Sequence, residues 1–447
     1  MGAETGECGW PARRSQNGRP SSPGGAETPS PGGGESPSPG GAETPYPGGG
    51  ERSSPDGRGE FPFHTFVLKF HSRCDLACDY CYMYRAADQS WRHQPRSMSP
   101  AVIAWTARRI AEHVHTHGLR AVSVVLHGGE PLLAGPRLLR LAVTEIARAV
   151  GPGVRVTTAV QTNALRLDEA WLDTLGELDV RIGVSLDGDR AAHDRHRVRP
   201  GGGGSHRRVA AAVQRLAEGP HRRLFAGLLC TVDLRNDPHT TYRELLRYRP
   251  PMIDFLLPLG TWDAPPPGRI PGRPDTPYGD WLAAVFDQWY AAPVRETDVR
   301  VLRDLVSLVL GGRSRTEGLG LEPVRYAVVE TDGSIALDDT LRVARAGAAR
   351  TGLHVARDSF DRALGHPDVR ARQSGAAALS AVCRACPLLP VCGGGHHVHR
   401  YRADGTGFRN PSVYCPDLTG LIRHVHREVA ADTARLRRRA PAARTCP

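Results

Sequence analysis

Three cysteines stand within eight residues, at Cys74, Cys78 and Cys81, directly after an apolar run from residue 63 to residue 70. Three thiolates can hold three irons of a cubic iron–sulfur cluster and leave the fourth iron free to bind a small molecule. An open position also distinguishes catalytic from structural zinc sites. On spacing alone, a zinc knuckle, a disulfide pair and three core cysteines remain as alternatives.

A second group of cysteines near the C-terminus has the spacing CxxCxxxxxC followed by one more cysteine. Its members are Cys383, Cys386, Cys392 and Cys415. Four thiolates fill a metal site completely, so this group predicts a structural or electron-carrying centre rather than a substrate site. Taken alone, the spacing favours a zinc ribbon. We interpret Cys230 as a buried strand residue.

Three further polar motifs each follow an apolar run. They are His127-Gly128-Gly129-Glu130-Pro131, Gln161-Thr162-Asn163 and Ser185-Leu186-Asp187-Gly188. Glycines let the backbone approach a ligand closely, and the carbonyls of Gly128 and Gly129, with Glu130, can accept hydrogen bonds from an ammonium group. By itself, a Gly-Gly before proline is more often a turn.

Alternating strands and helices must position these motifs. We expect strands at residues 63–70, 122–126, 154–160, 180–186, 224–232 and 253–258, and helices at 100–117, 137–149, 169–178, 205–217 and 240–248. This alternation predicts an α/β fold, a partial TIM-like (β/α)6 barrel of parallel strands. Because the carboxyl ends of parallel strands share one face, the four motifs are expected to meet in one pocket.

The run CDLACDYC, with Tyr80 before its last cysteine and GGEP after the next strand, resembles the radical S-adenosylmethionine (SAM) enzymes. The resemblance implies a [4Fe-4S] cluster on Cys74, Cys78 and Cys81, with SAM on its open iron. It also implies that SAM is bound by Tyr82, Gly128, Gly129, Glu130, Gln161, Asn163, Ser185 and Arg197. Packing for Tyr82, loop hydrogen bonding for Gln161 and Asn163, a strand-end cap for Ser185 and a surface ion pair for Arg197 remain alternatives.

Next to such a core, the C-terminal cysteines resemble the SPASM extension, which holds auxiliary [4Fe-4S] clusters. A full SPASM domain has further cysteines around a β-hairpin and at a position separated by three residues from the third cysteine of this set. Here the hairpin region, residues 326–335, has none, and the later position is His396. We therefore predict one auxiliary cluster. We interpret His396, His397 and His399 as a solvated run.

The resemblance extends to a subfamily. The stretches FVLKFHSRCDLACDYCYMY, SVVLHGGEPLL, FLLPLGTWDAPPPG, VVETDGSI and CGGGHHVHRY resemble the cyclophane-forming (FxsB-type) peptide maturases. This implies that a 5′-deoxyadenosyl radical removes a β-hydrogen from a ribosomally made precursor peptide, and that the β-carbon then joins an aromatic ring. An auxiliary cluster would accept the released electron, and a flavodoxin or ferredoxin would supply reducing equivalents.

Loss of the ring proton requires an acceptor. Asp339 and Asp263 are candidates, as are Asp332 and Asp338, although aspartates after hairpins or beside prolines are usually turn residues. Other SPASM reactions, sulfatase maturation or thioether formation, are the alternative. The missing hairpin cysteines argue against the sulfatase type, which uses two auxiliary clusters. A zinc-stabilised nucleic-acid-binding protein is a third hypothesis, resting on charge and CxxC spacing.

Composition narrows these choices. The net charge is +11. Arginine supplies the basic side chains almost alone, since Lys69 is the only lysine. The basic stretch at residues 435–439 has no interleaved aromatic residues, so we predict no nucleic-acid partner. No signal peptide and no apolar run of about 20 residues is found, so we predict no membrane association. Ten clustered cysteines suit a reducing cytoplasm.

The chain is expected to have three parts. Residues 1–60 repeat the units PGGAETPS, PGGGESPS, PGGAETPY and PGGGERSS, which cannot bury a core, so we predict a disordered tail. Residues 61–295 are expected to form the radical SAM partial barrel. Residues 296–447 are expected to form a SPASM-like auxiliary-cluster domain with a C-terminal helix. Cys8 and Cys446 lie in predicted tails.

Overall fold

The computed structural model describes residues 61–439, so the predicted tail at residues 1–60, with Cys8, and Cys446 lie outside the described residues. All six predicted strands are present: β1 (Thr65–His71), β2 (Ala121–Gly128), β3 (Arg155–Thr162), β4 (Arg181–Ser185), β5 (Phe225–Thr231) and β6 (Met252–Leu256). So are the five predicted helices: α2 (Pro100–Thr116), α3 (Pro136–Val150), α4 (Glu169–Glu177), α6 (His206–Glu218) and α7 (Pro238–Leu246).

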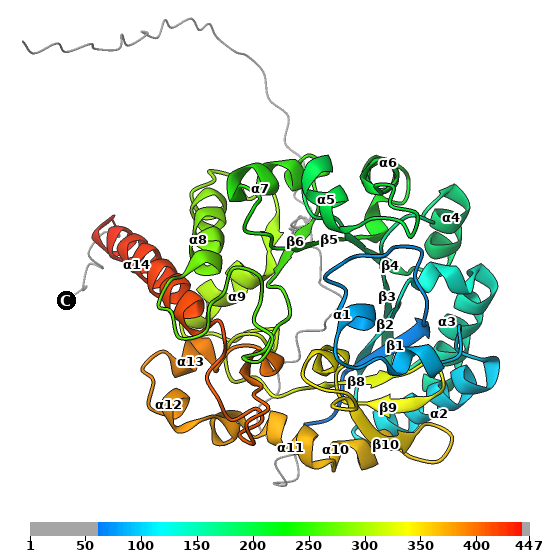
Figure 1. Cartoon of the computed structure of the whole chain (residues 1–447). Helices are drawn as coiled ribbons and strands as arrows, with labels where there is room; N and C mark the ends of the chain where they lie inside the picture. Colours follow the sequence, from blue (N-terminus) through cyan, green and yellow to red (C-terminus); the bar gives the residue numbers. More distant parts are fainter. Residues whose placement is uncertain (1–60, 440–447) are drawn as a thin grey trace, which may run out of the picture. The chain divides into compact units, whose positions relative to one another are not determined.

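The strands form one sheet in the order β10-β9-β8-β1-β2-β3-β4-β5-β6-β7. Strands β1 to β6 are parallel neighbours in chain order. In Figure 1 the helices α2, α3, α4, α6 and α7 lie outside the arc of strands. Phe66, Leu126 and Ile182 are fully buried, as expected for parallel strands covered on both faces. The predicted α/β partial barrel is therefore confirmed.

Side-chain caps fix where several of the outer helices begin. The hydroxyl of Ser99 accepts from the backbone N–H of Val102 at 3.2 Å, and Asp168 and Asp237 cap α4 and α7 in the same way. Such caps satisfy N–H groups that have no partner within the helix. They set the length of each connection, and so the position of each strand end.

The C-terminal third of the chain contributes strands to the same sheet. β8 (Tyr326–Val329) lies parallel to β1, and β9 (Ser334–Ala336) and β10 (Arg350–His354) continue the sheet in antiparallel fashion. At the other edge β7 (Asp298–Val299) pairs with β6. The sheet thus crosses the predicted boundary at residue 295, and that division stays a prediction.

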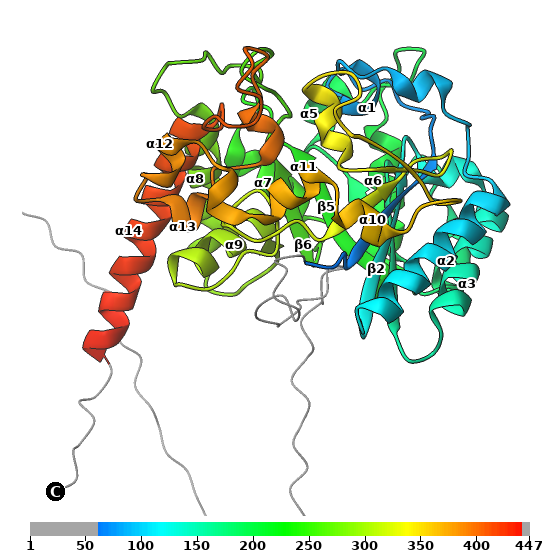
Figure 2. The same cartoon turned by 90° about the horizontal axis from the view of Figure 1, so that it is seen from below.

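Helices complete the C-terminal part. α8 (Pro277–Tyr290) and α9 (Arg300–Val309) both contact the long α14 (Cys415–Arg439), which runs beside them in Figure 2. The short helices α12 (Ala381–Arg384) and α13 (Leu389–Cys392) carry two of the C-terminal cysteines. No helix within residues 61–439 is long and apolar enough to cross a membrane.

Candidate functional site

The first three cysteines lie on the loop that joins β1 to α1 (Tyr82–Arg85), at the carboxyl end of β1. All three thiols are free and partly buried. Burial raises the pKa of Cys78 to about 11 and also raises those of Cys74 and Cys81. Bound iron reverses this preference, because a thiol that coordinates a metal is deprotonated and its proton is released.

Two N–H donors point at the sulfur of Cys74. The backbone N–H of Leu76 lies 3.4 Å from it, and the side-chain amide nitrogen of Asn163, at the end of β3, lies 3.6 Å away. Donors of this kind stabilise a cluster-bound thiolate and tune its potential. Three free thiols on one loop, with amides aimed at a sulfur, form a donor set that fits a [4Fe-4S] cluster.

The two glycines after β2 are required by packing against the cysteine loop. Gly128 has φ +144°, and a Cβ there would collide with the carbonyl oxygen of His71. A Cβ on Gly129 would collide with the carbonyl of Arg73. The N–H groups of Gly129 and Glu130 donate to those same carbonyls at 2.8 and 2.9 Å. The close approach that these glycines make in the structure is therefore to the loop after β1.

Glu130 is buried, and its carboxylate joins the loops after β2 and β3. It accepts from the backbone N–H of Leu132 at 2.9 Å, the hydroxyl of Thr162 at 2.8 Å and the N–H of Asn163 at 2.8 Å. Burial raises the pKa of Glu130 to about 7, against the effect of these donors. Through this carboxylate, the GGEP loop positions the residue whose amide faces Cys74.

Two other predicted residues meet across neighbouring strands: the amide of Gln161, on β3, donates to the hydroxyl of Ser185, on β4, at 3.1 Å. Arg197 lies at the end of α5 (Arg190–His196) and binds the buried Asp187 through Nε at 2.8 Å and Nη2 at 3.2 Å. Tyr80, within the cysteine loop, also donates to Asp187. In Figure 2, α1 and α5 lie on the same side of the sheet.

Tyr82 reaches a different part of the chain. Its hydroxyl donates to Asp339 at 2.8 Å, and the ammonium group of Lys69, on β1, forms an ion pair with the same oxygen. Asp339 begins the short 3-10 helix η4 (Asp339–Val343), directly after the β8–β9 hairpin. One of the candidate proton acceptors is thus adjacent to the cysteine loop.

The other candidate aspartates are engaged elsewhere. Asp263 is exposed and accepts from the N–H of Ala403 at 2.8 Å. Asp332 accepts from the N–H of Ser334 at 2.8 Å within the hairpin turn. Asp338 forms an ion pair with Arg372 at 3.0 Å. None of these three contacts involves the cysteine loop.

The C-terminal cysteines converge from four places in the sequence. All four thiols are free. Burial, together with the charges of the other three cysteines, raises the pKa of Cys392 to about 11. The guanidinium of Arg400 donates to the carbonyls of Gly393, Gly394 and Gly395 at 3.2, 3.1 and 2.5 Å. These glycines have positive φ, which lets the turn fold around that side chain.

His396 lies close to two carboxylates, one of them just after the β8–β9 hairpin. Glu317, Asp338 and His396 place their ligand atoms within 4.8 Å of one another. Arg372 lies between the carboxylates, 2.5 Å from Glu317, and its side chain is buried. A buried guanidinium repels a divalent cation, so we interpret this cluster as an ion-pair network. His396 stands at the position where a full SPASM domain has a further cysteine, and the number of auxiliary clusters stays a prediction.

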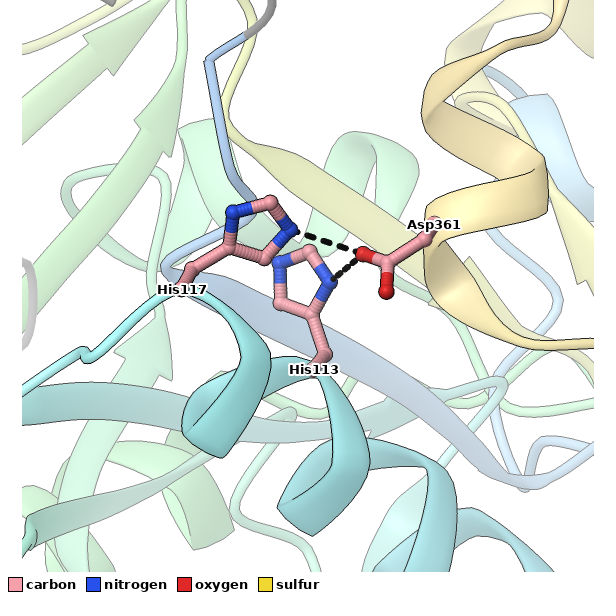
Figure 3. A group of neighbouring side chains, drawn as sticks. All are labelled: His113, His117 and Asp361. Atoms are coloured by element: carbon pink, nitrogen blue, oxygen red, sulfur yellow. Dashed lines mark hydrogen bonds and ion pairs between the residues drawn. The ribbon is translucent and has the colours of Figure 1, made fainter. Parts of the chain in front are cut away.

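A second group of possible metal ligands lies away from the cysteine loop. Figure 3 shows His113, on α2, and His117, just after it, pointing at Asp361 on α10 (Phe360–Leu364), at 2.6 and 2.8 Å. His113 Nε2 accepts from the backbone N–H of Phe63 at 3.0 Å, so its Nδ1 carries the proton that Asp361 accepts. With both nitrogens engaged, His113 fastens α10 to the barrel.

Comparison with known proteins agrees with this geometry. Residues 68–230, which contain the cysteine loop and the ends of β2 to β4, match the radical SAM superfamily. The chain contains a radical SAM domain. The predicted enzyme class, an iron–sulfur enzyme of the radical SAM type, is confirmed at this level, and SAM and a [4Fe-4S] cluster are the cofactors of such a domain.

Curated relatives include two kinds of maturase. The serine-type anaerobic sulfatase-maturating enzyme of Klebsiella aerogenes is 31% identical over 140 residues, which are 31% of this chain and 33% of that protein. The cysteine-type enzyme of Clostridium perfringens is 23% identical over 279 residues, 61% of this chain and 73% of that protein. The match thus spans about a third of the serine-type relative.

Solved structures share the fold of this chain. Native anSMEcpe with bound AdoMet aligns with a TM-score of 0.70 at 19% identity, covering 83% of this chain and 99% of that one. Streptococcus suis SuiB bound to its precursor peptide SuiA aligns with a TM-score of 0.50 at 14% identity, covering 80% and 76%. At these identities the likeness concerns the fold.

Three polar residues near the radical SAM site were not among those assigned from the sequence. Asp187 holds Arg197 and Tyr80, Lys69 pairs with Asp339, and Thr162 supports Glu130. Asp187 and Thr162 stood within the recognised strand-end motifs, and Lys69 was conspicuous as the single lysine. The histidine run was misinterpreted: His399 is buried and packs against Tyr414, with ring centroids 4.8 Å apart.

Proposed function

We propose that this protein is a radical SAM maturase that acts on a ribosomally made peptide and joins an aromatic ring carbon to a β-carbon, forming a cyclophane. The observation that carries the proposal is the meeting of the cysteine loop with Asp339. Tyr82, which follows the last loop cysteine, donates to that carboxylate at 2.8 Å. A proton acceptor beside a radical-generating centre suits an oxidative crosslink.

The cofactors fit residues already described. When bound, a [4Fe-4S] cluster and SAM supply a 5′-deoxyadenosyl radical, which removes a hydrogen atom from an unactivated carbon. Cys74, Cys78 and Cys81 are the proposed cluster ligands. The proposed SAM contacts are Tyr82, Gly128, Gly129, Glu130, Gln161, Asn163, Ser185 and Arg197. Of these, Gln161 and Ser185 hold each other, and Arg197 is oriented by Asp187.

A product lighter by two hydrogens must lose a hydrogen atom, a proton and an electron. We assign the proton to Asp339, because Asp263, Asp332 and Asp338 are held in turns or ion pairs. We assign the electron to an auxiliary cluster on Cys383, Cys386, Cys392 and Cys415. A flavodoxin or ferredoxin is the proposed electron donor.

Sulfatase maturation is a second candidate, and the relatives favour it. The anaerobic sulfatase-maturating enzymes of Klebsiella and Clostridium are similar to this chain over 140 and 279 residues, and anSMEcpe shares its fold. Against this candidate, the β8–β9 hairpin has no cysteine, and Asp338 is bound there by Arg372. The two reactions differ in whether one residue or a pair of residues is changed.

Mass spectrometry distinguishes crosslinking from sulfatase maturation. Anaerobically reconstituted enzyme would be incubated with SAM, reductant and short peptides encoded beside its gene. Crosslinking predicts loss of two mass units and suppressed fragmentation between two residues, one of them aromatic. Oxidation confined to a single serine or cysteine, with normal fragmentation, would favour sulfatase-type maturation. No 5′-deoxyadenosine with any peptide would reject both.

A further inference from the structure

Lys69 is a buried ammonium group beside the candidate reaction centre. It is the only lysine among 447 residues, in a chain that otherwise uses arginine for positive charge. It lies on β1, where its neighbours Leu68 and Phe70 are apolar and buried, and its own side chain is 1% exposed. Burying an amine costs free energy unless it is paired, so its partners define its role.

The ammonium group of Lys69 donates hydrogen bonds to two groups. His127, on β2, accepts through Nδ1 at 3.0 Å, and Asp339 accepts through Oδ2. Tyr82 donates to the same Oδ2 at 2.8 Å. Oδ1 of Asp339 receives none of the hydrogen bonds found within residues 61–439, and the Asp339 side chain is 13% exposed. One oxygen is therefore anchored, while the other remains available.

The other charges around Lys69 already have partners. Glu330, at the hairpin turn, binds Arg342 at 2.6 Å, and Asp338 binds Arg372 at 3.0 Å. Arg342 also lies near Asp88, at 3.5 Å. Burial lowers the pKa of Lys69 to about 7, and the negative charges of Glu330 and Asp338 oppose this effect. Asp339 is thus the carboxylate for which Lys69 is the counter-ion.

We propose that Lys69 is a positioning residue that keeps Asp339 ionised and turned toward the substrate as the proton acceptor. The inference rests on the proposed function and applies to either candidate reaction. In the reaction the substrate loses a hydrogen atom, a proton and an electron, and Asp339 takes the proton. When bound, SAM and the first cluster would supply the radical that takes the hydrogen atom, and a cluster held by Cys383, Cys386, Cys392 and Cys415 would accept the electron. Lys69 transfers no proton in this step, and its hydrogen bond to His127 helps to hold it in place.

A matched pair of variants separates charge from shape. Lys69→Gln removes the charge but keeps an amide donor near His127 and Asp339, whereas Lys69→Arg keeps the charge. Both would be tested as full-length, cluster-reconstituted enzyme with the converted peptide. For Lys69→Gln we expect SAM cleavage within about threefold of wild type and peptide product lowered by about 10²-fold, the scale of general acid–base catalysis. Lys69→Arg should recover most of the product.

The pH profile is the readout that a merely structural role would not move. Loss of the neighbouring cation favours the protonated form of Asp339, so the acidic limb of product formation should shift to higher pH in Lys69→Gln. The limb should stay in place for Lys69→Arg. In the double variant Lys69→Gln/Asp339→Asn, product should be no lower than in Asp339→Asn alone, since both changes disable one acceptor.

Each other outcome counts against the inference. Product at the wild-type rate with an unmoved acidic limb in Lys69→Gln would overturn it. So would equal losses in Lys69→Gln and Lys69→Arg, or loss of iron from Lys69→Gln, because the role would then be structural. If the wild-type enzyme forms no 5′-deoxyadenosine, the proposed function itself fails.

Discussion

Arg197 and Asp187 form a two-pronged ion pair directly behind the cysteine loop. The guanidinium spans both carboxylate oxygens, at 2.8 and 3.2 Å, and the two side chains are only 12% and 3% exposed. Thr231, on β5, donates its N–H to the same carboxylate at 3.0 Å, and Tyr80 binds it from the loop. One aspartate thereby joins β4, β5, α5 and the cluster-binding loop.

Asp187→Asn is expected to destabilise the protein by about 3 kcal/mol, because it leaves Arg197 buried without a counter-ion. It should also lower the iron bound on reconstitution, since Tyr80 loses its partner within the loop. Denaturant unfolding and iron analysis measure both effects. Asp173→Asn, at a surface pair with His221 where the aspartate is 69% exposed, is the matched control and should change little. Equal effects from the two variants would contradict this account.

Cys74→Ala is expected to abolish SAM cleavage, because the first cluster would lose one of three protein ligands. Cys230→Ala provides the control: it removes a more deeply buried thiol on β5 that belongs to neither cysteine group. We expect about eight irons per wild-type chain, about four in Cys74→Ala and an unchanged number in Cys230→Ala. Zinc without sulfide in the wild-type protein would instead indicate a zinc site.

Cys383→Ala should separate the two metal centres. The four C-terminal cysteines and the Arg400-bound glycine turn form a site of their own, so its loss should leave some SAM cleavage. Peptide product should fall more steeply than 5′-deoxyadenosine, because the proposed electron acceptor is missing. Measuring both products in one reaction tests this. A parallel loss of both, with unchanged secondary structure, would mean that the second centre also serves SAM cleavage.

Buried histidines should make the fold sensitive to acid. Burial, with the nearby Arg325, lowers the pKa of His64 to about 4, and burial, with Arg197, lowers that of His193 to about 3. The unfolded chain, with histidine pKa values near 6.5, then binds more protons as the pH falls, so stability is lost from about pH 6.5 downward. For His193 the loss at pH 5 is about 2 kcal/mol.

Denaturant unfolding of the cluster-free protein at pH 7 and pH 5 measures this loss. His64→Phe, which removes the titrating group just before β1, should flatten the dependence, because the contribution of His64 disappears. An unchanged difference between the two pH values in His64→Phe would contradict the assignment. A protein more stable at pH 5 than at pH 7 would contradict the sign.

The sequence predicted most of what depends on local pattern. Alternating apolar runs fixed the strands from β1 to β6, and the spacing of Cys74, Cys78 and Cys81 marked the cluster loop. The sequence could not predict contacts between distant segments. Tyr80 binds Asp187, 107 positions away, and Lys69 binds Asp339, 270 positions away. Such pairs depend on which strand ends and turns the fold brings together.

The glycine pair shows the same limit. From the sequence, Gly128 and Gly129 indicate close approach of a ligand, but the groups packed against them are the backbone carbonyls of His71 and Arg73 and the hydroxyl of Tyr84. No local pattern in the sequence shows that the GGEP loop packs on the cysteine loop. The buried His399 was likewise hidden, because a histidine run on a loop has no apolar periodicity.

Deuterium transfer is the most direct test of the central claim, that this enzyme starts its reaction at a carbon of a peptide. A substrate peptide deuterated at the β-carbon of the crosslinked residue would be incubated with reconstituted enzyme, SAM and reductant, and the 5′-deoxyadenosine analysed by mass spectrometry. The account predicts one deuterium in 5′-deoxyadenosine and a peptide lighter by one deuterium and one hydrogen. Unlabelled 5′-deoxyadenosine alongside a converted peptide would contradict it.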